Sequence, residues 1–136
     1  MLAALAFVPC TAFAQGWQDN YQGVMLQGFS WDSYVDTQWS NLESQSDELS
    51  KYFSLIWVPQ SGNCNSSWNV MGYMPVYYFD QNSSFGTEAQ LRSMISTSKA
   101  KGTGIIVDVV INHRNNLGAN GSWVDSPAEI YKGVTY

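Results

Sequence analysis

Charged side chains are scarce in this 136-residue sequence. Asp, Glu, Lys and Arg together make up 12% of the residues, about half of their share in an average soluble domain. Only six residues are Lys or Arg, the net charge is -5, and no basic run is available to bind phosphate groups. These shortages argue against nucleic acid as a partner and against binding to an acidic membrane surface.

Cysteine is rarer still, and one of the two cysteines lies in an N-terminal apolar run. This run, residues 1–14, ends in Ala12-Phe13-Ala14, a pattern typical of a signal-peptidase site, and it is too short to cross a bilayer. We therefore predict a signal peptide and a secreted or periplasmic protein; the alternative is a buried N-terminal helix. Because no basic residue precedes the run, we expect the signal to begin upstream of Met1. Cys64 is then the only cysteine left, so no disulfide is expected in residues 15–136.

Apolar runs and amphipathic stretches alternate along the rest of the chain. The runs predict strands at 23–29, 54–59 and 104–111, the first and third of them buried on both faces. The stretches predict helices over 36–53 and over 87–102, the second opening with the capping box Thr87-Glu-Ala-Gln90. This β-α-β-α-β order indicates parallel strands in an α/β protein, either an open doubly wound sheet or a barrel. The dinucleotide-binding open sheet loses support because no Gly-x-Gly-x-x-Gly follows a strand.

Aromatic and hydrogen-bonding residues collect after each predicted strand, in the segments 27–32, 60–86 and 112–114. The carboxyl ends of parallel strands converge on one face, which is where α/β proteins carry their sites. Aromatic rings combined with amide and hydroxyl groups, and with little charge, are typical of sites for neutral carbohydrate. In the long second segment, Tyr73 and Trp68 are the strongest candidates for stacking on a sugar ring.

The third predicted strand contains three further candidates. Asp108 interrupts an apolar run, so its carboxylate must be paired, either for architecture alone or in support of a site. Asn112 and His113 follow and are expected to point in different directions. An Asn amide oxygen suits calcium, whereas a single His is a weak indicator of zinc and could equally be an ordinary hydrogen-bonded residue.

Five segments in this order resemble the α-amylase family, glycoside hydrolase family 13, over about residues 22–114. They are Gln27-Gly-Phe-x-Trp-Asp32, Ile56-Trp-Val-Pro-Gln60, Gly72-Tyr-Met-Pro75, Phe85-Gly-Thr-Glu88 and Asp108-Val-Val-Ile-Asn-His113. The resemblance implies a (β/α)8 TIM barrel that is incomplete in this chain. Residues 15–113 would form its first three strands and two helices, and residues 114–136 would begin a domain inserted after the third strand.

The resemblance also implies an activity, the retaining hydrolysis of internal α-1,4-glucosidic bonds in starch or glycogen. Tyr73 and His113 would bind the sugar whose bond is cut, by stacking and by hydrogen bonding. Asn112 would be a calcium ligand, and Asp108 would support the site through an arginine on a neighbouring strand. The family's catalytic carboxylates come from strands four, five and seven, so none is expected in residues 1–136. The alternatives are another family-13 activity, such as a transglycosylase or debranching enzyme, and a non-catalytic glucan-binding protein.

Overall fold

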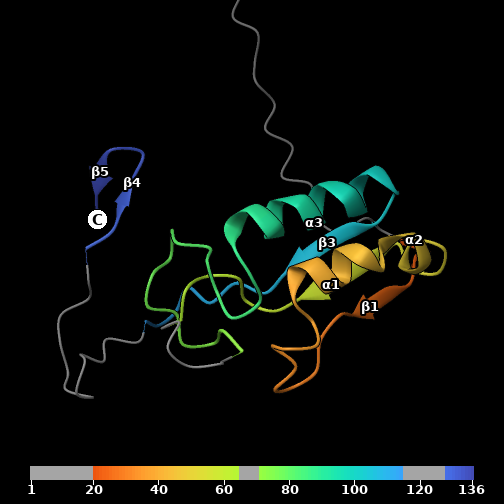
Figure 1. Cartoon of the computed structure of the whole chain (residues 1–136), viewed down its shortest axis with the longest axis horizontal. Helices are drawn as coiled ribbons and strands as arrows, with labels where there is room; N and C mark the ends of the chain where they lie inside the picture. Colours follow the sequence, from red (N-terminus) through yellow and green to blue (C-terminus); the bar gives the residue numbers. More distant parts are fainter. Residues whose placement is uncertain (1–19, 65–70, 115–127) are drawn as a thin grey trace, which may run out of the picture.

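The computed structural model describes residues 20–64, 71–114 and 128–136 (Figure 1). The predicted signal peptide and Trp68 lie outside the described residues. The elements are β1 (Met25–Gln27), α1 (Trp39–Ser44), α2 (Ser46–Leu49), β2 (Leu55–Val58), α3 (Glu88–Ala100), β3 (Gly104–Val107), β4 (Ile130–Tyr131) and β5 (Val134–Thr135). None of the helices in these ranges is long and apolar enough to cross a membrane.

The first three strands form one parallel sheet in the order β1-β2-β3. Leu26 pairs with Ile56, which pairs in turn with Ile105. The three arrowheads in Figure 1 point the same way, toward the long loop that follows β2. The predicted alternation of parallel strands and helices is therefore confirmed. β4 and β5 form a separate antiparallel hairpin.

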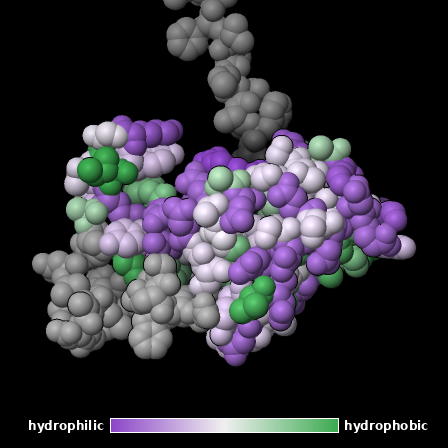
Figure 2. Space-filling model, viewed as in Figure 1, coloured by the Kyte–Doolittle hydropathy of each residue, from purple (hydrophilic) through white to green (hydrophobic). Residues whose placement is uncertain are grey.

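The core lies between one face of this sheet and the helices. Ile56 and Val58 are 2% and 0% exposed, and they pack in one cluster with Trp39 and Leu42 of α1 and Met94 of α3. The outward side of the two helices is mostly hydrophilic (Figure 2), as expected of amphipathic helices that cover a sheet.

The prediction of strands buried on both faces is wrong for the described residues. In β3, all four residues from Gly104 to Val107 are only half-buried. In β1, Met25 is 47% exposed. Alternate residues of a strand point to opposite faces, and the described helices cover only one of them, so the other face stays partly open.

Two element boundaries also differ from the prediction. The helix expected over 36–53 extends only from Trp39 to Leu49 and is divided into α1 and α2 at Gln45, where φ is -91° and ψ is -2°. The third strand ends at Val107 rather than at residue 111. A further backbone bond runs from Asp108 N to the carbonyl of Val58, directly after the last paired residues of β2 and β3.

The second predicted helix is confirmed as α3, and its capping box is complete. The Thr87 side chain accepts from Gln90 N, and the Gln90 side chain accepts from Thr87 N. From α1, the Glu43 carboxylate accepts hydrogen bonds from Ser93 and Thr97 of α3, which lower its pKa. These contacts fix the two helices side by side over the sheet.

Candidate functional site

Residues that follow all three strands meet at the carboxyl edge of the sheet. Tyr73, from the loop after β2, donates its hydroxyl to Asp108 Oδ2 at 2.8 Å, directly after β3. The Tyr73 ring is parallel to that of Trp31, which follows β1, with 5.9 Å between ring centroids and 4° between planes. The sequence predicted that the segments after the strands converge, and these contacts bring them together around Tyr73.

A close backbone approach positions Tyr73. The preceding Gly72 has φ +100°, and a Cβ on it would lie 2.5 Å from the carbonyl oxygen of Gln60. Only glycine fits there without strain. The Gly72 carbonyl accepts from Cys64 Sγ at 2.8 Å, and Pro75 is fully buried. The loop is therefore fixed against the end of β2 on both sides of Tyr73.

Cys64 is a structural residue in this arrangement. It is buried and free, and burial raises the pKa of its thiol to about 11. The thiol is therefore protonated at neutral pH and donates to carbonyl oxygens rather than acting as a nucleophile.

Asp108 lies directly after β3, and the arginine partner that the resemblance implies for it stays a prediction. Asp108 is half-buried rather than buried, and it accepts a hydrogen bond from the Tyr73 hydroxyl. Burial, together with the hydrogen bond to Asp108 and its charge, raises the pKa of Tyr73 well above its usual value. The phenol therefore stays protonated and the carboxylate accepts. The open second face of the sheet explains why the Asp108 side chain is not fully enclosed.

His113 is exposed and also reaches Tyr73. Its Nε2 lies 2.8 Å from the Tyr73 carbonyl oxygen, and its own carbonyl accepts from Tyr78 Oη at 3.0 Å. Asn112 is exposed beside it. In 20–64, 71–114 and 128–136, no group of three or more His, Cys, Asp or Glu side chains is placed to hold a metal ion.

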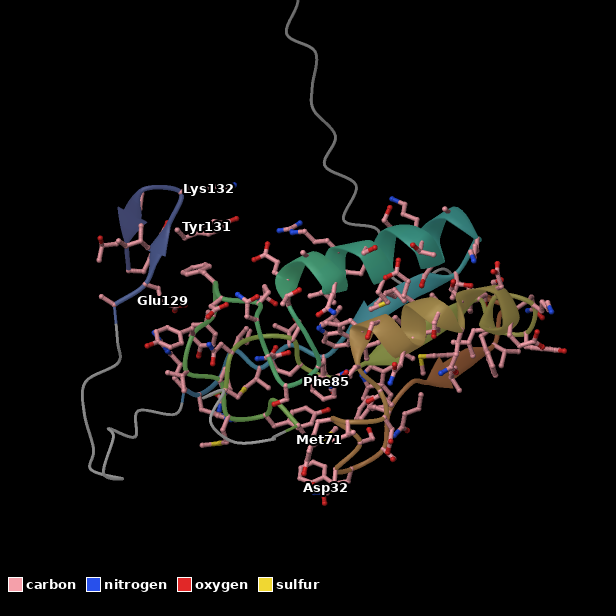
Figure 3. The ribbon with its side chains drawn as sticks, in the orientation of Figure 1. Asp32, Met71, Phe85, Glu129, Tyr131 and Lys132 are labelled. Atoms are coloured by element: carbon pink, nitrogen blue, oxygen red, sulfur yellow. The ribbon has the colours of Figure 1, made fainter. Side chains whose placement is uncertain are left out.

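A buried ion pair ties the hairpin to this site. Arg114 Nη2 lies 3.4 Å from Glu129 Oε2, and the two side chains are 17% and 5% exposed. Glu129 Oε1 also accepts from Phe79 N, while Arg114 donates to the carbonyl of Val76. Figure 3 shows Glu129 at the base of the hairpin. The loop that carries Tyr73 and the segment that carries His113 are thus joined to residues 128–136.

Sequence reasoning missed two of these features. The pairing of Glu129 with Arg114 and with the Phe79 amide has no local signal, because 50 residues separate Phe79 from Glu129. Trp31 did have a signal, since it is an aromatic residue among polar ones directly after a predicted strand.

The described residues thus form a partial α/β region, with a parallel sheet and an aromatic and polar site at its carboxyl edge. They do not close a barrel. No protein-family model matches the chain.

Comparison with known proteins shows which proteins this chain is related to. The chain is 29% identical over 127 residues to chloroplastic α-amylase 3 of Arabidopsis thaliana, covering 90% of the chain and 14% of that protein. It is 31% identical over 131 residues to the glucan 1,4-α-maltotetraohydrolase of Stutzerimonas stutzeri, covering 85% and 24%. A variant of α-amylase I from Eisenia fetida, solved with maltohexaose, superimposes with a TM-score of 0.58 at 26% identity over 71% of the chain and 19% of that structure.

The chain is therefore related to the α-amylases, which confirms the resemblance found in the sequence. It spans a quarter or less of the length of each of these three relatives.

Proposed function

We propose that the whole protein is a retaining glycoside hydrolase that cleaves internal α-1,4-glucosidic bonds of starch or glycogen. The observation that carries this proposal is the fixed position of Tyr73 at the carboxyl edge of the sheet, with Asp108 and His113 bound to it, in a chain related to α-amylases. A glucan presents apolar C–H faces and many hydroxyls, so it suits an aromatic ring surrounded by neutral or singly charged hydrogen-bonding groups.

In this proposal, each site residue has one role. The Tyr73 ring stacks on the sugar next to the bond that is cut, and the His113 imidazole hydrogen-bonds to a hydroxyl of the same sugar. Asp108 supports the site by holding the Tyr73 hydroxyl, so it positions the ring rather than reacting. Tyr73 is thereby held at its hydroxyl and at its carbonyl before substrate arrives, which reduces the ordering cost of binding.

Retaining hydrolysis requires two carboxyl groups about 5–5.5 Å apart across the scissile bond. Asp108 accepts from Tyr73, and Asp80 accepts from the side chains of Asn63 and Asn82, so both carboxylates are committed within the described loops. As the resemblance to family 13 implies, we assign the catalytic pair to later barrel strands, beyond Tyr136. In the same proposal, residues 15–113 belong to the catalytic barrel, residues 114–136 begin an inserted domain, and residues 1–14 direct secretion.

We assign Asn112 one oxygen ligand of a structural calcium ion. Calcium takes about six to eight oxygen ligands, and the described residues offer no acidic cluster beside Asn112 that would complete such a cage. The remaining ligands must therefore lie outside the described residues. Chelation should lower the Tm of the whole protein, and Asn112→Ala should reduce that calcium dependence. A Tm that does not respond to chelator would remove calcium from the proposal.

The direct test is the release of reducing ends from soluble starch by the whole protein, with a β-1,4-linked glucan as the control substrate. We expect activity on starch alone. Tyr73→Ala and His113→Ala should each lower turnover by an amount equivalent to about 2–4 kcal/mol of transition-state stabilisation. Tyr52→Ala is the matched control, because Tyr52 is 64% exposed and precedes β2, at the opposite edge of the sheet.

Circular dichroism and Tm measurements on each variant separate loss of activity from loss of folding. Near-normal turnover in both site variants would remove Tyr73 and His113 from the cleavage site. Binding of starch by the wild-type protein without any hydrolysis would instead favour the non-catalytic glucan-binding alternative.

A further inference from the structure

Glu129 is a buried carboxylate that has no role in the proposed function. Its side chain is 5% exposed, Oε1 accepts from Phe79 N at 2.9 Å, and Oε2 lies 3.4 Å from Arg114 Nη2. Burying a carboxylate is unfavourable unless it is paired and hydrogen-bonded, as it is here. Apolar side chains of similar volume often stabilise a core as well as a buried ion pair does, so packing alone does not explain why a charge is kept at this position.

The hairpin holds the Glu129 carboxylate in place. The backbones of Glu129 and Tyr136 exchange two hydrogen bonds, of 3.0 and 2.8 Å, at the base of the hairpin. The Phe79 ring stacks on that of Tyr131, with 4.6 Å between centroids, so the residue whose amide Glu129 binds is itself packed against the hairpin. Figure 3 shows Glu129 at this base, below Tyr131. The carboxylate is therefore presented from a fixed backbone.

Arg114 carries this constraint to His113, which directly precedes it in the chain. Arg114 Nε donates to the carbonyl of Val76 at 3.0 Å, and the guanidinium carbon lies 5.0 Å from the centroid of the Tyr78 ring. The hydroxyl of the same Tyr78 donates to the carbonyl of His113. Arg114 thus contacts both the loop and the ring that hold the backbone of His113.

The His113 side chain needs such support because packing does not supply it. His113 is exposed, and its imidazole meets the Tyr73 carbonyl through Nε2. The direction of an exposed ring depends on its polar contacts and on the backbone that carries it. The contacts of Arg114 and Tyr78 fix that backbone.

We propose that Glu129 is a positioning residue, which holds Arg114 and through it sets the direction of the His113 imidazole at the proposed cleavage site. This inference rests on the proposed function and adds to it a residue that lies outside the parallel sheet. Glu129 contacts no substrate and transfers no proton, so its whole effect on turnover passes through His113.

Glu129→Gln in the whole protein is the informative variant. The amide keeps the shape of the side chain and an oxygen for Phe79 N, but it removes the charge opposite Arg114. We expect kcat on soluble starch to fall by about tenfold, since a displacement of about 1 Å in a group that positions the substrate can cost roughly 100-fold. KM should change little, because the contact that is weakened acts mainly in the transition state.

A double-mutant cycle in kcat separates positioning from a general structural role. In the His113→Ala background, Glu129→Gln should have no further effect on kcat, because the residue through which it acts is gone. Glu129→Asp keeps the charge but retracts it from Arg114, so it should give a smaller loss of the same kind. It also serves for the same cycle if Glu129→Gln does not fold.

Glu48→Gln is the matched control. It also removes a carboxylate from an ion pair, since Glu48 Oε2 lies 2.5 Å from Lys51 Nζ. Glu48 belongs to α2, which precedes β2 and so lies toward the opposite edge of the sheet from the site. We expect kcat and KM of this variant to match those of the wild-type protein.

Each outcome has a distinct meaning. Wild-type kcat in Glu129→Gln, with His113→Ala still lowering turnover, would overturn the role of Glu129 and leave the proposed function intact. An equal fold-loss of kcat in the wild-type and His113→Ala backgrounds would also overturn it, because the effect would then not pass through His113. Absence of starch hydrolysis by the wild-type protein would overturn both the inference and the proposed function.

Discussion

Removal of the Tyr73 hydroxyl tests the arrangement at the strand ends most simply. In Tyr73→Phe, the ring and its stack on Trp31 remain, and only the hydrogen bond to Asp108 is lost. A hydrogen bond to a charged group contributes about 1.5–3 kcal/mol to stability. Both residues are half-buried, so we expect a value at the low end, about 1.5 kcal/mol.

The double-mutant cycle isolates this interaction. Tyr73→Phe and Asp108→Ala should each lower the free energy of unfolding, and the double variant should cost about 1.5 kcal/mol less than the sum of the two. Urea unfolding of the whole protein, followed by tyrosine and tryptophan fluorescence, measures the three differences. In the same variants turnover should fall, because the ring loses the contact that holds its outer end.

Tyr78→Phe is the control for this cycle. It also removes a hydrogen-bonded phenol hydroxyl, but its acceptor is the His113 carbonyl rather than Asp108. It should therefore show no coupling with Asp108→Ala. Strict additivity of Tyr73→Phe and Asp108→Ala would refute the assignment of Asp108 as the residue that positions Tyr73.

Three further outcomes follow from other contacts. Burial raises the pKa of Asp80, but hydrogen bonds from two asparagines outweigh it and hold the pKa below its usual value. The stabilising contribution of Asp80 is therefore present above its usual pKa and lost as pH falls through the lowered pKa, and Asp80→Asn should remove this part of the acid dependence of urea unfolding. Glu129→Gln should weaken the pair with Arg114 and speed amide exchange in residues 129–136, with little change in α3. Gly72→Ala should lower the Tm and turnover together, because the added Cβ meets the Gln60 carbonyl at φ +100°.

The sequence was most informative where a local pattern determines local structure. The capping box at Thr87 predicted the start of α3, and the apolar run before Pro59 predicted β2 to within a residue at each end. The aromatic and polar segments after the strands predicted which edge of the sheet would carry the site, because parallel strands place their carboxyl ends together.

Long-range pairing and the burial of each strand face could not be predicted from the sequence. An apolar run such as 104–111 has the same pattern whether one face or both faces of the strand are covered, so the open face of the sheet could not be predicted. The sequence required a partner for Asp108 but did not identify Tyr73, which lies 35 residues away. The division of the first helix at Gln45 is a local change of backbone angles, which the apolar spacing does not report.

An experimental structure of the whole protein with bound maltohexaose would measure the position of the sugar directly. We expect one glucose ring to stack on Tyr73 within hydrogen-bonding distance of the His113 imidazole. A maltohexaose chain bound elsewhere, for example over Phe79 and Tyr131 in the hairpin region, with Tyr73 free of sugar, would contradict the proposal that the carboxyl edge of this sheet is the glucan site.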